Sequence, residues 1–156
     1  MALDEKEVKI WIDADACPKV IKEVVYKFSS RLRIPVVLVA NSYMNIPHDE
    51  LITFVKVDSG ADVADMYIAN HSTENDLIIT ADIPLASEIV KKGALAINPR
   101  GELYDEDNIS ERLSMRDFMK DLRDNGLVTG GPDAFSSKDK ITFTNTLNKI
   151  LTKKGF

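Results

Sequence analysis

The chain has 156 residues, of which 44% are hydrophobic and 29% charged, a composition typical of one soluble globular domain. Its single cysteine excludes an internal disulfide and fits a reducing compartment. The longest apolar run, residues 34–40, is too short to cross a bilayer, and the acidic N-terminus does not resemble a secretory signal. We therefore expect a cytoplasmic protein with no membrane association.

The net charge of −5 is unevenly distributed along the chain. Residues 1–107 contain 11 Lys/Arg and 19 Asp/Glu, giving −8, whereas residues 108–156 contain 9 and 6, giving +3. A metal-dependent phosphodiesterase could use this division, with carboxylates holding the metal and basic side chains meeting phosphates. The simpler interpretation is two solvated surfaces of opposite charge.

Strands and helices alternate along the first hundred residues. Strands are predicted at residues 8–12, 36–39, 51–57, 77–80 and 94–97, with helices at 18–31, 62–70 and 84–91. This alternation indicates βαβ units and an α/β fold, a three-layer sandwich around a central, mainly parallel sheet.

The chain becomes more basic and helical from about residue 108. Asn108 and Glu111 resemble a capping box opening a helix over residues 108–123, and Ser136 is predicted to cap a final helix to about residue 151. The first of these helices has a basic stripe made of Arg112, Arg116, Lys120 and Arg123. Beside it lies an apolar face, expected to pack on the sheet, made of Met115, Phe118, Met119 and Leu122. The final helix could pack on the sheet or on a second copy in a homo-oligomer.

Five aspartates are predicted to converge at the carboxyl edge of the sheet. Asp13 and Asp15 follow the first strand, Asp82 follows strand 77–80, and Asp62 and Asp65 open a helix, one turn apart. Clustered carboxylates repel one another, and a divalent cation removes that repulsion. Mg²⁺ and Mn²⁺ prefer such oxygen ligands.

Zinc is a less suitable ion, because His48 and His71 are not at ligand spacing and Cys17 stands alone. A packing role is favoured for Cys17. Three of the five aspartates also have a structural alternative as helix caps, namely Asp15, Asp62 and Asp82 for the helices that follow them.

Other polar residues near the strand ends are candidates for contact with a substrate. Asn41 and Thr80 could hydrogen-bond to substrate or to a bound water, and Arg100 could reach a phosphate. Structural roles are equally open for all three.

Several motifs in chain order resemble the YaiI/YqxD family of uncharacterised bacterial proteins. They are Trp11-Ile-Asp-Ala-Asp-Ala-Cys-Pro18, Asp62-Val-Ala-Asp65, Ile79-Thr-Ala-Asp-Ile-Pro-Leu85, Asn98-Pro-Arg-Gly101, Met115-Arg-Asp-Phe-Met119 and Thr129-Gly-Gly-Pro132. The family is similar to PIN and NYN nuclease domains, so the resemblance implies a single PIN-like domain over residues 1–156.

The resemblance also implies site residues. Asp13 matches the aspartate that ends the first strand of PIN domains, Asp62 or Asp65 the acidic residue of a middle helix, and Asp82 the aspartate of a Thr-x-Asp-like segment. Asp15 is an additional carboxylate. For a fourth acidic position found in many PIN domains, Asp105 and Asp107 are the nearest candidates.

Three functional hypotheses follow. The first is a Mg²⁺- or Mn²⁺-dependent nuclease acting on RNA, in which Arg112, Arg116 and Arg123 position the nucleic-acid backbone. The second is a non-catalytic PIN-like module that binds RNA or a protein partner. The third is a haloacid-dehalogenase-like phosphatase, with Asp13 as nucleophile and Asp15 as acid/base, which would also need a lysine such as Lys91 or Lys92.

Overall fold

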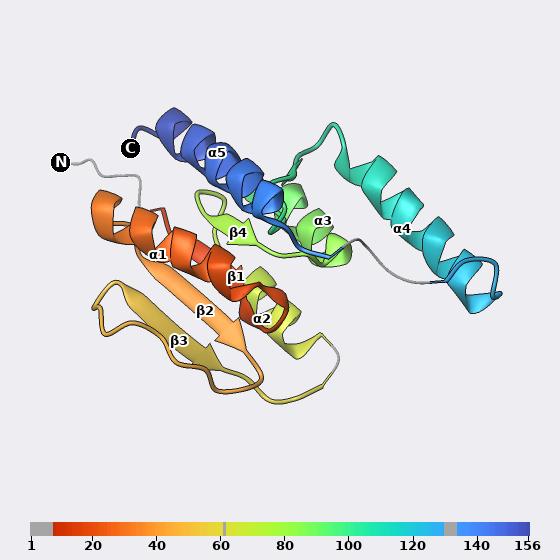
Figure 1. Cartoon of the computed structure of the whole chain (residues 1–156), viewed down its shortest axis with the longest axis horizontal. Helices are drawn as coiled ribbons and strands as arrows, with labels where there is room; N and C mark the ends of the chain where they lie inside the picture. Colours follow the sequence, from red (N-terminus) through yellow and green to blue (C-terminus); the bar gives the residue numbers. More distant parts are fainter. Residues whose placement is uncertain (1–7, 61, 130–133) are drawn as a thin grey trace.

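The described residues, 8–60, 62–129 and 134–156 of a computed structural model, form a six-stranded sheet with helices on both faces (Figure 1). The strands are β1 (Ile10–Asp13), β2 (Val36–Ala40), β3 (Ile52–Lys56), β4 (Leu77–Ile79), β5 (Leu95–Ile97) and β6 (Leu103–Tyr104). Their spatial order is β3-β2-β1-β4-β5-β6, and only the β5–β6 pair is antiparallel. The order reverses at β1, which places β1 and β4 side by side at the centre.

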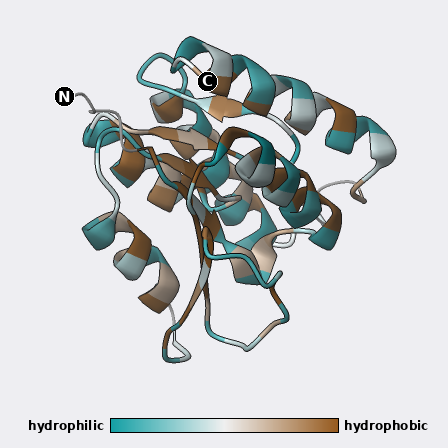
Figure 2. Ribbon diagram, turned by 90° about the vertical axis from the view of Figure 1, so that its left-hand side faces the viewer, coloured by the Kyte–Doolittle hydropathy of each residue, from teal (hydrophilic) through white to brown (hydrophobic). Residues whose placement is uncertain are grey.

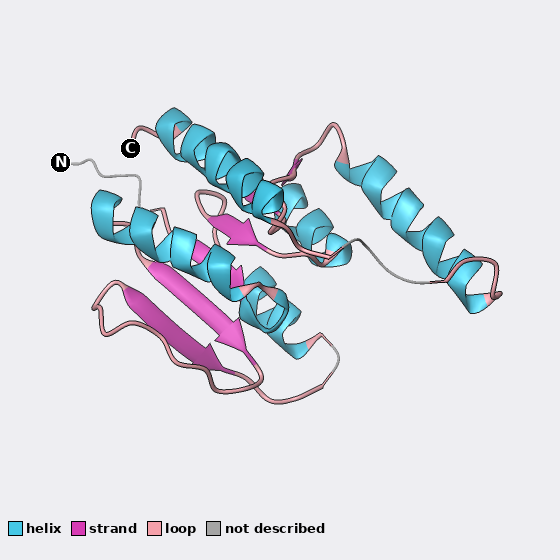
Figure 3. Cartoon of the chain, in the orientation of Figure 1, coloured by secondary structure: helices cyan, strands magenta, loops and turns pink. Residues whose placement is uncertain are grey.

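Helices follow most of the parallel strands (Figure 3). They are the short 3-10 helix η1 (Ala14–Ala16), α1 (Lys19–Leu32), α2 (Val63–His71), α3 (Ile83–Lys91), α4 (Ile109–Asp124) and α5 (Ser137–Lys153). The β2–β3 connection is different, because β2 and β3 are parallel neighbours joined without a helix. None of the helices in the described part of the chain combines the length and apolar character needed to cross a bilayer.

Two hydrophobic clusters lie on opposite faces of the sheet. Helices α1 and α5 cover one face, and α2 and α3 cover the other. The brown, hydrophobic strands accordingly lie inside, while the helices turn teal residues outward (Figure 2). The predicted α/β three-layer sandwich with a mainly parallel sheet is therefore confirmed.

The final helix, α5, packs on the sheet and on α1. Its apolar residues are buried against the sheet and α1, and they are Phe143, Leu147, Ile150 and Leu151. Ser136 caps the helix, and the side chain of Asp139 completes a capping box, as the sequence predicts for the cap. These four apolar side chains of α5 are thus covered by the same chain.

Helix α4 differs from the prediction. Met115 is 53% and Phe118 57% exposed, and Ile109 is the helix's buried residue. The expectation that this apolar face packs on the sheet is wrong, because α3 already covers that side and α4 packs against α3 instead. The predicted capping box at Asn108 is also absent, since the Asn108 amide donates to the Leu103 carbonyl.

The buried Asp76 fixes the start of the two central strands. Its carboxylate accepts hydrogen bonds from Lys9 N–H at 3.0 Å, from the Trp11 indole N–H at 2.9 Å and from Thr73 N–H at 2.9 Å. Three donors satisfy a charge that is only 2% exposed, which makes its burial tolerable. Asp76 lies at the opposite edge from the candidate site, so its role is structural.

Candidate metal and substrate site

A buried hydroxyl joins the carboxyl ends of the two central strands. Asp13, the last residue of β1, is 8% exposed, and Thr80 follows β4 and is 1% exposed. Thr80 Oγ1 donates to Asp13 Oδ2 at 2.9 Å and accepts from Asp82 N–H at 3.0 Å. Because β1 and β4 are parallel neighbours, this pair of hydrogen bonds fixes Asp13 and Asp82 at the same edge.

The side chains of Asp82 and Asp15 hold the surrounding loops. Asp82 Oδ1 accepts from Leu85 N–H at 2.8 Å and so caps α3. Asp15 does not cap α1, whose N-cap position is Pro18; its Oδ2 accepts from Asn41 N–H at 2.7 Å. Asp15 and Asn41 therefore tie the segment after β1 to the end of β2.

Asp62 and Asp65 enter the site from α2. Asp65 lies in the first turn of the helix, and Asp62 occupies the N-cap position with no capping hydrogen bond from its side chain. The backbone of Asp62 is left-handed, with φ of +67°. Aspartate tolerates this conformation better than most residues, although it remains costly for any residue with a Cβ.

Burial and neighbouring carboxylates raise the pKa values of Asp65 and Asp13. Burial, followed by the charge of Asp82 and then of Asp13, raises the pKa of Asp65 to about 7. A hydrogen bond between the Asp65 and Asp82 side chains and the charge of Asp62 act in the same direction. The pKa of Asp13 is also raised, chiefly by burial and further by Asp82 and Asp15, while the Thr80 hydrogen bond opposes the increase. Carboxylates from three segments therefore lie within one electrostatic field.

The described side chains of the cluster do not form a closed cage for a cation. Within the ranges that the structure describes, no three acidic, His or Cys side chains are arranged to hold a metal ion. Asp82 is turned to the N-terminus of α3, and Asp65 bonds to Asp82. The donor chemistry nevertheless fits Mg²⁺ or Mn²⁺, which take hard oxygen ligands, and Mg²⁺ commonly uses one or two carboxylates and retains several waters.

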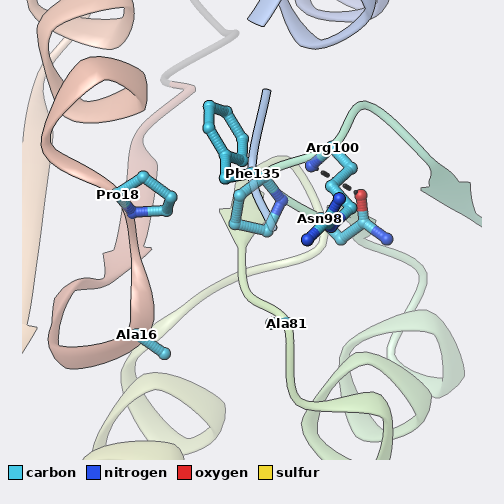
Figure 4. A pocket seen from close by; sticks show the side chains of 7 residues that line it. Ala16, Pro18, Ala81, Asn98, Arg100 and Phe135 are labelled. Carbon is cyan, nitrogen blue, oxygen red and sulfur yellow. Dashed lines mark hydrogen bonds between the residues drawn. The ribbon is translucent and has the colours of Figure 1, made fainter. Parts of the chain in front are cut away.

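A pocket of about 350 Å³ is shown in Figure 4, and its lining residues Ala16 and Ala81 are the chain neighbours of Asp15 and Asp82. Its lining residues are Ala16, Pro18, Ala81, Asn98, Pro99, Arg100 and Phe135. The segments that follow β1, β4 and β5 form its walls, together with Phe135 just before α5. The sequence interpretation identified Arg100 here but missed Phe135 and Pro18, whose places at the pocket depend on long-range packing and have no local signature.

The predicted basic residues divide into two groups. Arg100 lies at the pocket, where Nη1 contacts Asp139 Oδ2 at 2.9 Å. Arg112, Arg116 and Arg123 lie on α4, which packs on α3, and Arg112 reaches the turn between β5 and β6. Arg112 pairs with Glu102, and Arg116 pairs with Asp117 at 3.0 Å. The structure therefore does not bring these three arginines into the carboxylate cluster.

The remaining candidate residues from the sequence lie away from the carboxylate cluster or outside the described residues. Lys91 and Lys92 end α3 and so lie at the other edge of the sheet, where Lys92 Nζ donates to the Ser72 carbonyl at 2.7 Å. Asp105 accepts hydrogen bonds from Asp107 and Asn108 N–H in the turn before α4. Residues 130–132 of the Gly-rich turn lie outside the described residues.

The family model and the most similar relatives place the chain in one family. Residues 11–153 match the family described as "Uncharacterized BCR, YaiI/YqxD family". A UPF0178 protein of Trichlorobacter lovleyi is 59% identical over 92% of this chain and 94% of its own length. UPF0178 proteins of Shewanella sp. strain ANA-3 and Geobacter metallireducens are 55% and 56% identical, each over 94% of this chain and over 98% and 94% of their own lengths. No solved structure matches the chain. The protein therefore belongs to the YaiI/YqxD family.

Proposed function

We propose that this protein is a PIN-like nuclease that hydrolyses a phosphodiester of RNA with a Mg²⁺ or Mn²⁺ ion held at the carboxyl edge of the sheet. The observation that carries the proposal is the convergence of Asp13, Asp65 and Asp82 from three segments, where burial and neighbouring carboxylates raise the pKa values of Asp13 and Asp65. Such a concentration of negative charge is costly for folding alone, and a cation offsets the cost.

Asp13 would hold the ion, together with Asp65 and Asp82 once these two exchange the hydrogen bond between them for the cation. A bound divalent cation supplies Lewis-acid chemistry, neutralising charge on a phosphoryl oxygen and making a water nucleophilic. Thr80 keeps the Asp13 carboxylate oriented through its 2.9 Å hydrogen bond. A bound cation would lower the pKa of Asp65 from the value of about 7 that burial and the neighbouring carboxylates give it, so Asp65 would be ionised as a ligand. Asp15 and Asp62 add negative charge at the rim.

A direct test compares cleavage of a fluorescent single-stranded RNA by wild type, Asp13→Asn and Asp58→Asn, with Mn²⁺ or with chelator. Asp58 is an exposed aspartate after β3 and serves as the matched control. We expect Mn²⁺-dependent cleavage by wild type and Asp58→Asn, reduced at least 100-fold in Asp13→Asn. Equal cleavage by Asp13→Asn would overturn the assignment of the site.

A non-catalytic module that binds RNA or a protein partner is the second candidate. One observation favours it, namely that the described side chains form no ready-made set of three metal ligands. This function predicts RNA affinity that falls steeply with salt, without cleavage and with no change on adding Mn²⁺. The phosphatase alternative has less support, because Lys91 and Lys92 lie at the opposite edge from Asp13.

A further inference from the structure

We infer that the pocket lined by Phe135 and Pro18 binds one unpaired nucleobase of the substrate strand, next to the phosphodiester at the carboxylates. This inference rests on the proposed function and assigns it a single-stranded substrate. The pocket and the carboxylates are adjacent along the chain, because the lining residue Ala81 precedes Asp82 and the lining residue Ala16 follows Asp15. A strand whose phosphate meets the carboxylates therefore has the pocket as its neighbour.

The lining suits the faces of a flat ring better than a charged group. Five of the seven lining residues are apolar, and they are Ala16, Pro18, Ala81, Pro99 and Phe135. In Figure 4 Pro18 lies on one side of the opening and Phe135 on the other, with Ala16 and Ala81 below them. A half-buried phenyl ring at such an opening is a stacking surface, and base–aromatic stacking tolerates any base.

The polar residues of the pocket build its wall. Asn98 Oδ1 accepts from Arg100 N–H at 2.9 Å and from Glu102 N–H at 3.0 Å, and its Nδ2 donates to the Tyr104 hydroxyl at 3.1 Å. These bonds fix the turn that carries Arg100. The Arg100 guanidinium lies 5.9 Å from the Phe135 ring centroid and is paired with Asp139, so a backbone phosphate passing the rim would share Arg100 with that carboxylate.

The volume of the pocket fits a single nucleoside. A volume of about 350 Å³ is at the lower end of the roughly 300–1,000 Å³ common for ligand pockets, so it admits one base with its sugar and no base pair. A second cavity of about 300 Å³, lined by Asp62, Asp65 and Glu88 among others, lies between α2 and α3. None of the described residues lining that cavity is aromatic, whereas the Phe135 pocket offers a ring on which a base can stack.

The test uses the full-length chain and an RNA pentadecamer with 2-aminopurine at successive positions, whose fluorescence is quenched on stacking. Binding is measured in the Asp13→Asn background, which is expected to leave the strand intact. Cleavage is measured in the background that retains Asp13. Phe135→Ala removes the ring, Phe135→Leu retains apolar packing without it, and Phe135→Trp retains an aromatic ring. Circular dichroism of each variant checks the fold.

We expect quenching at one position in the bound strand, about 5- to 100-fold weaker binding with Phe135→Leu, and recovery with Phe135→Trp. In cleavage, Phe135→Leu should raise KM with little change in kcat.

Cleavage and affinity unchanged in Phe135→Leu would overturn the base pocket and leave the nuclease proposal intact. Quenching that depends on Phe135 without any cleavage would support the pocket and overturn the nuclease. Equal binding of a duplex would overturn the single-strand assignment.

Discussion

Thr80 is the residue on which the geometry of the carboxylate cluster depends. Its hydroxyl donates to Asp13 and accepts from the amide of Asp82, and both contacts are within 3.0 Å. A methyl group in its place would leave a buried carboxylate oxygen and a backbone N–H without these partners, and such losses are costly in a protein interior. The hydroxyl therefore positions two candidate ligands.

The first prediction concerns Thr80→Val, which keeps the side-chain shape and removes the hydroxyl. We expect the free energy of unfolding to fall by about 2 kcal/mol, because two polar groups lose their partner. The pKa of Asp13 should rise further, since the Thr80 hydrogen bond lowers it. Urea denaturation measures the first effect and NMR titration of the Asp13 carboxyl the second. Thr80→Ser restores the hydroxyl and should recover the Asp13 pKa; no change in that pKa in Thr80→Val would contradict the assigned bond.

A second prediction follows from the pKa of Asp65, which burial and neighbouring carboxylates raise from its ordinary 3.8 to about 7. Between these pH values the folded protein binds more protons than the unfolded chain, so stability falls as pH rises through the window. In chelator, we expect the free energy of unfolding to decline from pH 4 to pH 7, with a flatter profile in Asp65→Asn. A wild-type profile that rises throughout this range would refute the raised pKa.

Residue spacing was sufficient to bring Asp13 and Asp82 to one edge, because the carboxyl ends of parallel strands meet there. Spacing alone could not assign the partner of each carboxylate. Asp15 bonds to the amide of Asn41, 26 residues away, and this contact depends on the pairing of β1 with β2. The pocket depends on Phe135 returning to the strand ends just before α5, a long-range placement without a local signature.

At the scale of elements, strong periodicity predicted most strands and helices, and the failures have physical causes. The two-residue strand β6 is too short to show a pattern and exists through its pairing with β5. The amphipathic pattern of α4 predicted burial on the sheet, yet α3 occupies that surface. Periodicity identifies an apolar face but not the surface available to cover it.

The docking of α5 depends on a close approach at Gly101. This residue has φ of +94°, and a Cβ there would stand 2.7 Å from the backbone nitrogen of Phe143. Thr146 Oγ1 donates to the Gly101 carbonyl at 2.8 Å, which joins the helix to the turn carrying Arg100. The wall of the pocket and the position of α5 are therefore coupled.

The third prediction compares Gly101→Ala with Gly126→Ala. Gly126 also has a left-handed backbone, with φ of +72°, but a Cβ there would meet nothing within 4 Å. We expect Gly126→Ala to cost about 1 kcal/mol from backbone conformation alone. Gly101→Ala should cost about 3 kcal/mol or more, because α5 must also move. Urea denaturation measures both, and equal costs would show that the contact with α5 contributes little.

At the scale of the whole molecule, the charge distribution opposes folding at one edge of the sheet. The chain carries a net charge of −5, and the carboxylates of Asp13, Asp65 and Asp82 lie within one another's fields. A ligand that binds only the folded state stabilises it according to concentration and affinity. Thermal stability therefore reports metal binding without any knowledge of the substrate.

The fourth prediction is that Mn²⁺ raises the melting temperature more at pH 8 than at pH 5. At 100 times Kd the stabilisation is about 2.7 kcal/mol, which corresponds to roughly 5–10 °C for a domain of this size. Protonation of Asp65 opposes binding at pH 5, because its pKa is about 7 in the absence of metal. Asp13→Asn/Asp82→Asn should abolish the shift at pH 8, whereas Asp58→Asn should retain it. An equal shift in the double variant would place the ion elsewhere, and a larger shift at pH 5 would contradict a carboxylate site.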